Sequence, residues 1–128
     1  MNLIKEEKMI KQFIKLTYQN RILFEFKNPQ KRLSGYMRFS HNTKKILNND
    51  KIFSIRKMIS KSDFFDFFSK TDSLYIISVS YIDGIILRLE EAYDLISNEY
   101  MPVIIIGEDK VLIKEETEKR DVHFFLLA

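Results

Sequence analysis

The amino-acid sequence predicts an α+β protein with a mostly antiparallel sheet built from hairpins, an amphipathic N-terminal helix and two short helices. Two β-branched and aromatic runs lie within Leu74–Leu89 and are joined by Asp83-Gly84. Asp-Gly between such runs is the strongest short-range signal for a tight hairpin turn. The first residues instead repeat apolar side chains at helical spacing. A chain of 128 residues, 45% of them hydrophobic, is long enough for one domain with a sizeable core.

A two-residue turn at Asp83-Gly84 would place Ile82 opposite Ile85 and divide the hairpin side chains between two faces. One face has Leu74, Ile76, Ile82, Ile85, Leu87 and Leu89 with two serines, and the other has Tyr75, Ile77, Val79, Tyr81 and Ile86. Both faces are apolar. We therefore expect the hairpin to be central in its sheet, with a helix layer or a second sheet on one side and another cover on the other.

The amphipathic helix is expected over Leu3–Tyr18, with Asn2 as its N-cap and its apolar side packed on the sheet. Charged and apolar residues alternate in this opening segment. It is therefore expected to be neither a signal peptide nor a membrane span. On this basis we place the protein in the cytoplasm and expect no membrane partner.

Residues 21 to 58 are predicted to form strands. Arg21–Lys27 alternates apolar and polar residues, and Arg32–Phe39 repeats the alternation after a turn signal at Asn28-Pro29. Gly35 is expected at a bend or bulge of the second strand. Lys44–Met58 contains two short runs separated by polar residues, which predicts another hairpin.

This region is similar to Sm-like and Hfq-like small barrels, in which a helix precedes a strand, a turn, and a second strand with a Gly near its middle and a Phe near its end. The matching residues are Ile22–Phe26, Leu33-Ser34-Gly35 and Phe39. Ser40 stands where Hfq-like proteins have Asp, and Ile55-Arg56-Lys57 stands where they have Tyr-Lys-His. Length and composition predict a single α+β domain, 1–128, or two small halves that share a core. The resemblance implies that the basic half, 1–62, is a helix followed by a small-barrel-like part, packed on the acidic sheet half, 63–128.

The second half is predicted to hold two short helices, a second hairpin and a last strand. The helices are Ser60–Phe68, with Ser60 or Ser62 as N-cap, and Glu91–Tyr100, which ends before Pro102. Val103–Ile106 and Val111–Lys114 form the hairpin, an acidic link from Glu115 follows, and Val122–Leu127 is the strand. An apolar strand of this kind should pair into the sheet or into a neighbouring subunit.

The residue types argue against most catalytic chemistry. The absence of cysteine excludes a disulfide framework, a thiol nucleophile and the usual structural zinc sites. Two histidines lie in dissimilar segments, and the three glycines are assigned to turns or bends, so no phosphate-binding loop can be assembled. We therefore expect a protein that is not an enzyme and has no cofactor or metal. The alternative is a hard-cation site at Glu90, Glu91, Asp94 and Glu99.

The charge is divided unevenly along the chain. Residues 1–62 hold 15 Lys and Arg against 4 Asp and Glu, whereas residues 63–128 hold 6 against 14. Such asymmetry indicates an anionic partner for the basic half, or halves that face one another within a chain or in a homo-oligomer.

A nucleic-acid or nucleoprotein interface is predicted in the basic half. If Arg32, Tyr36 and Arg38 share the wet face of one strand, two guanidiniums lie beside an aromatic plane, an arrangement suited to phosphates and a stacked base. The surrounding cations are Lys27, Lys31, Lys44, Lys45, Arg56, Lys57 and Lys61.

An alternative function rests on four phenylalanines in the first short helix, Phe64, Phe65, Phe67 and Phe68. They would either close one end of the sheet or form an exposed aromatic anchor for another protein. The second possibility corresponds to a protein-binding inhibitor or an immunity-type module of a mobile element.

Overall fold

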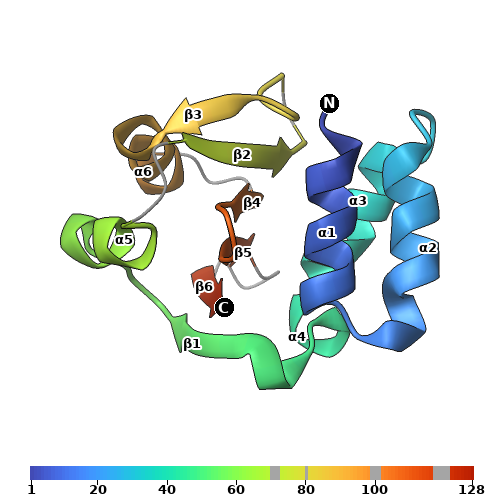
Figure 1. Ribbon diagram of the computed structural model, residues 1–128, viewed down its shortest axis with the longest axis horizontal. Helices are drawn as coiled ribbons and strands as arrows, with labels where there is room; N and C mark the ends of the chain where they lie inside the picture. The colour runs from blue at the N-terminus through green and yellow to red at the C-terminus, as the bar shows by residue number, and fades with distance from the viewer. Residues whose placement is uncertain (70–72, 80, 99–101, 117–121) are drawn as a thin grey trace.

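The computed structural model describes residues 1–69, 73–79, 81–98, 102–116 and 122–128. Within them, an antiparallel sheet has the strand order β1-β6-β5-β4-β2-β3 and lies between two layers of helices (Figure 1). The strands are β1 (Ile52–Arg56), β2 (Ser73–Ser78), β3 (Ile86–Arg88), β4 (Val103–Ile106), β5 (Val111–Glu116) and β6 (Val122–Leu127). The helices are α1 (Leu3–Phe13), α2 (Leu16–Lys27), α3 (Arg32–His41), α4 (Thr43–Ile46), α5 (Lys61–Phe67) and α6 (Leu89–Asn98). The predicted α+β class is confirmed.

The N-terminal helix is confirmed but is shorter than predicted. The Asn2 side chain accepts a hydrogen bond from the backbone N–H of Lys5 at 3.1 Å and caps α1. The helix ends at Phe13 because Ile14 forms an isolated antiparallel bridge with Leu47. A second helix, α2, then begins at Leu16.

The predicted strands over residues 21–39 are wrong, because both segments are helical. Ile22 and Phe26 lie one turn apart on the buried side of α2, whereas Phe24, expected to point inward, is 56% exposed. Gly35 lies inside α3 and marks neither a bend nor a bulge. A Cβ at Gly35 would lie 2.6 Å from the Cβ of Glu25, so this glycine allows α2 and α3 to approach closely. The resemblance to a small barrel is therefore wrong for this region.

The hairpin predicted over Lys44–Met58 is also wrong. Its first run forms α4, and a 3₁₀ turn at Asn49–Lys51 leads into β1. β1 does not pair with the preceding run. It pairs instead with β6, which is nearly at the other end of the sequence, and Ile55 lies opposite Phe125.

The register predicted for the Asp83-Gly84 hairpin is wrong, although its two faces are confirmed. In the ladder, Tyr75 pairs with Ile86. Ile76 donates to the carbonyl oxygen of Ile85 and accepts from the N–H of Gly84, so Ile76 takes the ladder position predicted for Ile82. The carbonyl oxygen of Ile82 accepts the turn bond from the Ile85 N–H. The shift from Ile82 to Ile76 is an even number of residues, so the strand residues keep their predicted faces, with Leu74 and Ile76 on one side and Tyr75 and Ile77 on the other. Tyr81, predicted on the same face as Tyr75, is instead in the turn and 95% exposed. β3 is an edge strand, so the hairpin is not central. The central strands are β5 and β4.

The other elements predicted for the second half are present, but the acidic link does not begin at Glu115, because Glu115 and Glu116 are the last residues of β5 and pair with β6. Ser60 caps α5, and β4 and β5 form the predicted hairpin. β6 is paired on both sides, with β5 and β1, so this apolar strand lies inside the sheet. The predicted end of the second helix at Tyr100 and the acidic residues from 117 onward lie outside the described residues.

Two apolar cores lie on opposite faces of the sheet. The core under α1–α4 includes Met9, Phe13, Phe26, Tyr36, Phe39, Tyr75, Ile104 and Phe125. The core under α5 and α6 includes Phe64, Phe68, Leu74, Ile76, Ala92, Ile96, Ile105 and Leu126. The helices described here include none long and apolar enough to cross a membrane.

Candidate functional site

The predicted triad of Arg32, Tyr36 and Arg38 does not share a wet face. All three lie on α3, where Arg32 and Tyr36 are 6% and 2% exposed and Arg38 points to the surface. The sequence analysis missed this because it assigned strand periodicity to the segment. At helical spacing, positions 32, 36 and 39 share the buried side.

Arg32 is the centre of a buried polar network. Its Nη1 and Nη2 donate to the two carboxylate oxygens of Glu6 at 2.6 and 2.8 Å, and Nη1 also donates to the carbonyl oxygen of Phe26 at 3.0 Å. Its Nε and Nη2 donate to the two oxygens of Asp83 at 2.7 and 2.9 Å. These five bonds use all five N–H donors of a guanidinium. Arg32 therefore has no donor left for a phosphate in the described structure.

Two tyrosines border this network and differ in their hydrogen bonding. The Tyr75 hydroxyl donates to Glu6 and accepts from the backbone N–H of Asn2. Burial and the bond to Glu6 raise the pKa of Tyr75 to about 12. The Tyr36 hydroxyl is buried without a hydrogen-bond partner. Burial and the charge of Asp83 raise the pKa of Tyr36 far above its ordinary value.

A second buried carboxylate, Glu25, pairs with the other two arginines of the helical layer. Arg38 donates to its two oxygens at 2.7 and 2.8 Å, and Arg21 donates from Nε at 2.9 Å. These residues border a shallow groove of about 150 Å³ that is also lined by Asn42 and Lys45. The groove brings together two of the predicted cations, Arg38 and Lys45.

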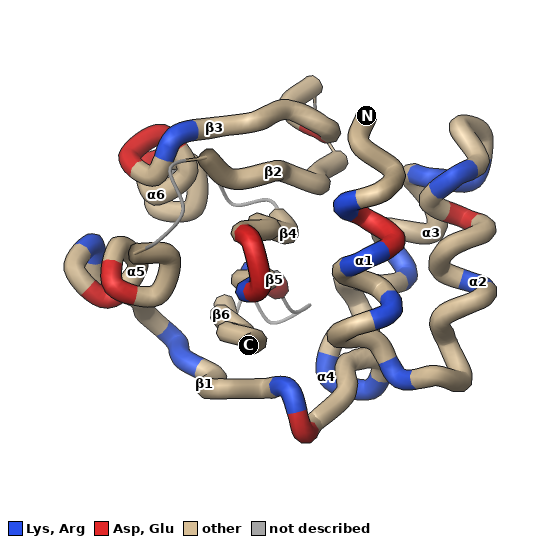
Figure 2. Tube along the Cα trace, viewed as in Figure 1, with Lys and Arg blue, Asp and Glu red and all other residues tan. Residues whose placement is uncertain are grey.

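The exposed charge of the helical layer is almost entirely positive. Residues 1–47 contain three carboxylates, and Glu6 and Glu25 are buried beneath arginines. Glu7, half-buried, pairs with Lys11 at 3.1 Å and Lys27 at 3.6 Å, and Lys11 lowers the pKa of Glu7. We call the exposed cations of this layer the basic helical layer: Lys5, Lys8, Lys11, Arg21, Lys27, Lys31, Arg38, Lys44 and Lys45. Figure 2 shows basic positions along α1, α2 and α3.

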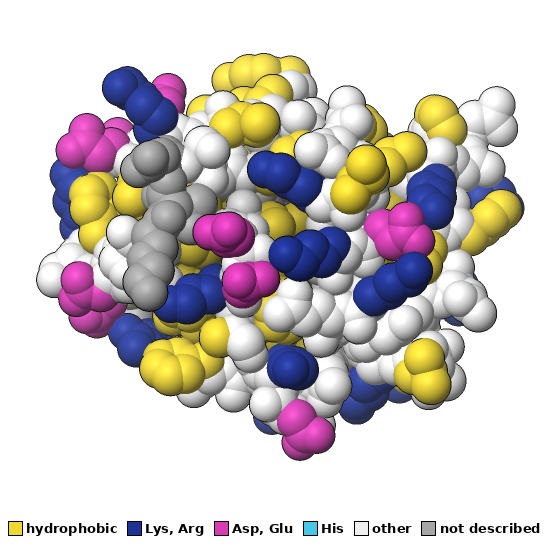
Figure 3. Space-filling model, viewed as in Figure 1, with side chains coloured by type: hydrophobic (Ala, Val, Ile, Leu, Met, Phe, Trp, Pro, Cys, Tyr) yellow, Lys and Arg dark blue, Asp and Glu magenta, His cyan; other side chains and the backbone are white. Residues whose placement is uncertain are grey.

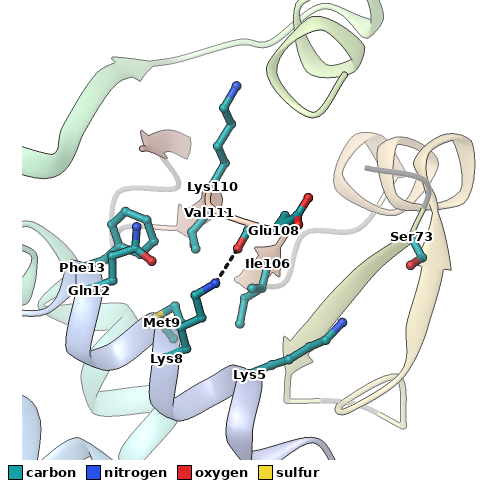
Figure 4. Close-up of a pocket in the computed structure, with 11 residues that line it drawn as sticks. Lys5, Lys8, Met9, Gln12, Phe13, Ser73, Ile106, Glu108, Lys110 and Val111 are labelled. Carbon is teal, nitrogen blue, oxygen red and sulfur yellow. Dashed lines mark hydrogen bonds between the residues drawn. The ribbon is translucent and has the colours of Figure 1, made fainter. Parts of the chain in front are cut away.

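The lysines of α1 border the groove drawn in Figure 4, which we call the lysine groove. It has a volume of about 410 Å³ and lies between α1 and the turn joining β4 to β5. Its rim includes Lys5, Lys8 and Lys110, and its apolar walls include Phe13 and Val111. Basic side chains gather around this part of the molecule, and acidic side chains lie beside them (Figure 3).

Lys8 crosses the groove and contacts the β4–β5 turn. Its Nζ donates to the carbonyl oxygen of Glu108 at 3.4 Å and lies 3.3 Å from a carboxylate oxygen of Asp109. Lys110 extends the other way, toward α5, and its Nζ lies 5.3 Å from the centre of the Phe67 ring. Both partners of Lys8 are exposed, so this contact is weak and the ammonium can exchange it for an anion.

The remaining predicted cations lie apart from the basic helical layer. Arg56 and Lys57 lie on and just after β1, at the edge of the sheet, and Arg56 is 3.0 Å from Asp63 of α5. The structure therefore divides the predicted set: Lys27, Lys31, Arg38, Lys44 and Lys45 belong to the helical layer, whereas Arg56 and Lys57 do not. Four cations of the layer were not predicted, although the basic side of the N-terminal helix was a visible signal: Lys5, Lys8, Lys11 and Arg21.

The phenylalanine cluster lies mainly in the core. Phe64, Phe67 and Phe68 are buried between α5 and the sheet, and Phe65 is half-buried beneath the ammonium of Lys61 at 5.6 Å. They close one end of the sheet, as the first of the two interpretations predicted. Large exposed apolar side chains lie nearby on β1 instead, where Phe53 and Ile55 are 67% and 45% exposed.

The two histidines are not part of a metal-binding cluster among the described residues. His41 is exposed at the end of α3 and His123 is half-buried on β6. Within the described ranges, no three His, Cys, Asp or Glu side chains are placed to hold a metal ion. Comparison with protein-family models, curated protein sequences and solved structures finds no match to this chain. The function must therefore be argued from geometry and charge.

Proposed function

We propose that this protein binds nucleic acid, free or in a nucleoprotein, through the basic helical layer and without catalysis. The main observation that supports this proposal is the burial of Glu6 and Glu25. It removes two of the three carboxylates of residues 1–47 from the surface, whereas the lysines of the layer stay exposed. Each lysine adds a small attraction for phosphate, and the attractions add along a polyanion.

The state of the arginines limits what such binding can recognise. Specific reading of guanine usually requires a bidentate arginine or lysine in the major groove. Arg21, Arg32 and Arg38 are all engaged with carboxylates, so the layer presents mainly flexible lysines. Lysine acts on phosphate as a point charge. We therefore expect phosphate-dominated binding with little sequence preference.

The test measures fluorescence anisotropy of a labelled 20-nucleotide single strand and the matching duplex. The double variant Lys44→Glu with Lys45→Glu reverses two charges in the basic helical layer. Lys57→Glu with Lys61→Glu makes the same change in net charge beyond β1 and serves as the matched control. We expect at least about a tenfold greater loss of affinity for the first pair, because local charge determines phosphate contacts. Equal losses, or no binding by the wild type at low salt, would refute the proposal.

A second candidate function, binding of a protein partner, is favoured by the free edge at β1. This strand pairs on one side with β6 and carries exposed Phe53 and Ile55, whereas edge strands are usually protected by charge or proline. A partner strand could add to this edge. An inhibitor or immunity-type module would then use Phe53 as its anchor in place of Phe64–Phe68.

The two candidates make opposite predictions for two variants. Protein binding requires that a purified, identified partner forms a stoichiometric complex that is lost in Phe53→Asp and kept in Lys44→Glu with Lys45→Glu. Nucleic-acid binding requires the reverse pattern. Self-association through the opposed charges of the two halves stays a prediction, and light scattering across a salt series measures it.

A further inference from the structure

A second cavity lies on the far side of α1 from the lysine groove and has a different chemistry. It has a volume of about 410 Å³ and lies among the start of α1, the α2–α3 turn and the loop after β2. Its walls are mostly apolar and include Leu33, Ile77 and Val79. Its polar lining includes Tyr36 and Asp83. Ligand sites are commonly apolar clefts of this size with a few convergent polar groups.

The Tyr36 hydroxyl is the unusual feature of this cavity. Tyr36 is 2% exposed and its oxygen has no hydrogen-bond partner. Buried hydroxyl groups in proteins nearly always have a hydrogen-bond partner, so a buried hydroxyl without one needs a physical explanation. Because this hydroxyl is neutral at ordinary pH, it offers an O–H donor to an acceptor atom in the cavity.

Asp83 provides a complementary acceptor. Its Oδ1 accepts from Arg32 and from the backbone N–H of Ser78, whereas its Oδ2 accepts one described bond, from Arg32 Nε at 2.7 Å. A carboxylate oxygen can accept a second bond. The cavity therefore combines one donor, Tyr36, with one acceptor, Asp83.

The charges around the cavity argue against an anionic ligand. All N–H donors of Arg32 are used, and Lys27 at the rim is 3.6 Å from Glu7. A carboxylate or phosphate head would lose its water shell beside Asp83 without gaining a free cation. An ammonium head would lose its water shell in a mostly apolar cavity, where both oxygens of Asp83 already accept bonds from Arg32.

We propose that this cavity binds a small uncharged molecule with an apolar body and an amide-like head, whose carbonyl oxygen accepts from Tyr36 and whose N–H donates to Asp83. The apolar body lies against Leu33, Ile77 and Val79. This site is separate from the basic helical layer and does not depend on nucleic-acid binding.

The test uses two probes of equal chain length, octanamide and octanoate, titrated into methyl-labelled protein at neutral pH and followed by NMR. We expect octanamide to give saturable shifts at the methyl groups of Ile77 and Val79, and none at Ile96 on the opposite face of the sheet. Octanoate should bind at least about tenfold more weakly, because its charge is desolvated beside Asp83. Absence of saturable shifts, or tighter binding of octanoate, would overturn the proposal.

Three variants locate the bound molecule. Tyr36→Phe should weaken octanamide about threefold to tenfold, which corresponds to one lost hydrogen bond. Leu33→Trp should block the cavity, whereas Leu16→Trp, an exposed change elsewhere in the helical layer, should not affect binding. Unchanged octanamide affinity in Tyr36→Phe, or equal effects of the two tryptophan variants, would contradict the assignment. The shift map of the wild-type protein tests the location without any variant.

Discussion

Glu6 and Arg32 form a buried, bidentate ion pair with N–O distances of 2.6 and 2.8 Å. Glu6 belongs to α1 and Arg32 to the first turn of α3, and Arg32 also holds Asp83 in the loop after β2. One guanidinium thus joins three segments of the chain across the helical layer and the sheet. Loss of Arg32 would leave the two carboxylates, Glu6 and Asp83, without their shared cation in the interior of the protein. Breaking a buried ion pair in this way costs more free energy than the intact pair contributes.

Replacing Arg32 should therefore be costly. In Arg32→Ala, Glu6 and Asp83 lose their shared partner, and we expect the free energy of unfolding to fall by about 3 to 5 kcal/mol. Urea unfolding followed by circular dichroism measures the change. Arg88→Ala breaks an ion pair whose arginine side chain is 82% exposed, and should cost less than about 1 kcal/mol. Similar losses in the two variants would show that the buried network contributes little.

Tyr36→Phe and Tyr75→Phe remove the same atom from two buried tyrosines with different surroundings. The Tyr36 hydroxyl has no partner, so its removal should leave the stability unchanged or raise it by up to about 1 kcal/mol. The Tyr75 hydroxyl bonds to Glu6, and its loss should cost about 1 to 3 kcal/mol. The same urea experiment compares them. A large loss in Tyr36→Phe would mean that this hydroxyl has a partner in solution.

Alkaline pH should reduce the stability contributed by Tyr75. Its pKa is about 10 in the unfolded chain and is raised to about 12 in the folded protein, so the unfolded state loses its proton first. This contribution is fully present below pH 10 and is lost as the pH rises toward 12. The difference in stability between wild type and Tyr75→Phe should shrink over that interval, because the phenylalanine variant lacks the titrating group. A constant difference from pH 9 to pH 12 would contradict the raised pKa.

Gly35→Ala should destabilise the protein although alanine is the better helix former. A Cβ at this position would lie 2.6 Å from the Cβ of Glu25 and force α2 and α3 apart. Overpacking of this kind typically costs about 1 to 3 kcal/mol, more than the gain of about 1 kcal/mol in helix propensity. Thermal unfolding measures the effect, and Ser34→Ala, exposed at the next position, should change the melting temperature little. A stabilised Gly35→Ala would show that Glu25 can move at no cost.

The salt dependence of nucleic-acid binding should report the number of lysines involved. Each phosphate neutralised contributes about −0.7 to −0.9 to the slope of log K against log salt. The double variant Lys44→Ala with Lys45→Ala should therefore reduce the magnitude of the slope by about 1.4 to 1.8, measured by anisotropy between 50 and 200 mM salt. Lys57→Ala should leave the slope unchanged. A slope near zero for the wild type would exclude counterion release as the source of affinity.

The fold could be predicted from the sequence where a single periodicity fits a segment. The capping side chains of Asn2 and Ser60 and the apolar runs of β4, β5 and β6 identified their elements correctly. The segment Arg21–Lys27 fits both periods, because Ile22 and Phe26 are two strand repeats and also one helical turn apart. The Arg21–Glu25 ion pair at helical spacing was the local signal that favoured the helix.

For the candidate site, the sequence predicted the kind of residue, an excess of Lys and Arg, but not which of these residues form the surface. An excess of cations in the first half was visible in the sequence, but which of them remain at the surface depends on where Glu6 and Glu25 are buried. Tertiary packing decides this, because Arg32 meets Asp83 from a segment 51 positions away. The register of the β2–β3 hairpin also depends on tertiary contacts that the sequence pattern does not show. The turn bond from the Ile85 N–H to the Ile82 carbonyl oxygen is present at 3.2 Å, but Asp83 also bonds to Arg32 and to the backbone of Ser78, so contacts from α3 and β2 help to set the loop.

The pairing of β1 with β6 also determines when the sheet can be completed during synthesis. β1 lies beside a strand made about 70 residues later, and no other described strand pairs with it. As a ribosome produces the chain, the α1–α4 helices and the β2–β4 strands can assemble early, but β1 has no place to dock until residue 127 has emerged. Until then, Phe53 and Ile55 lie on a segment without a partner strand among those described. Loop closure over this distance should therefore be a late step in folding.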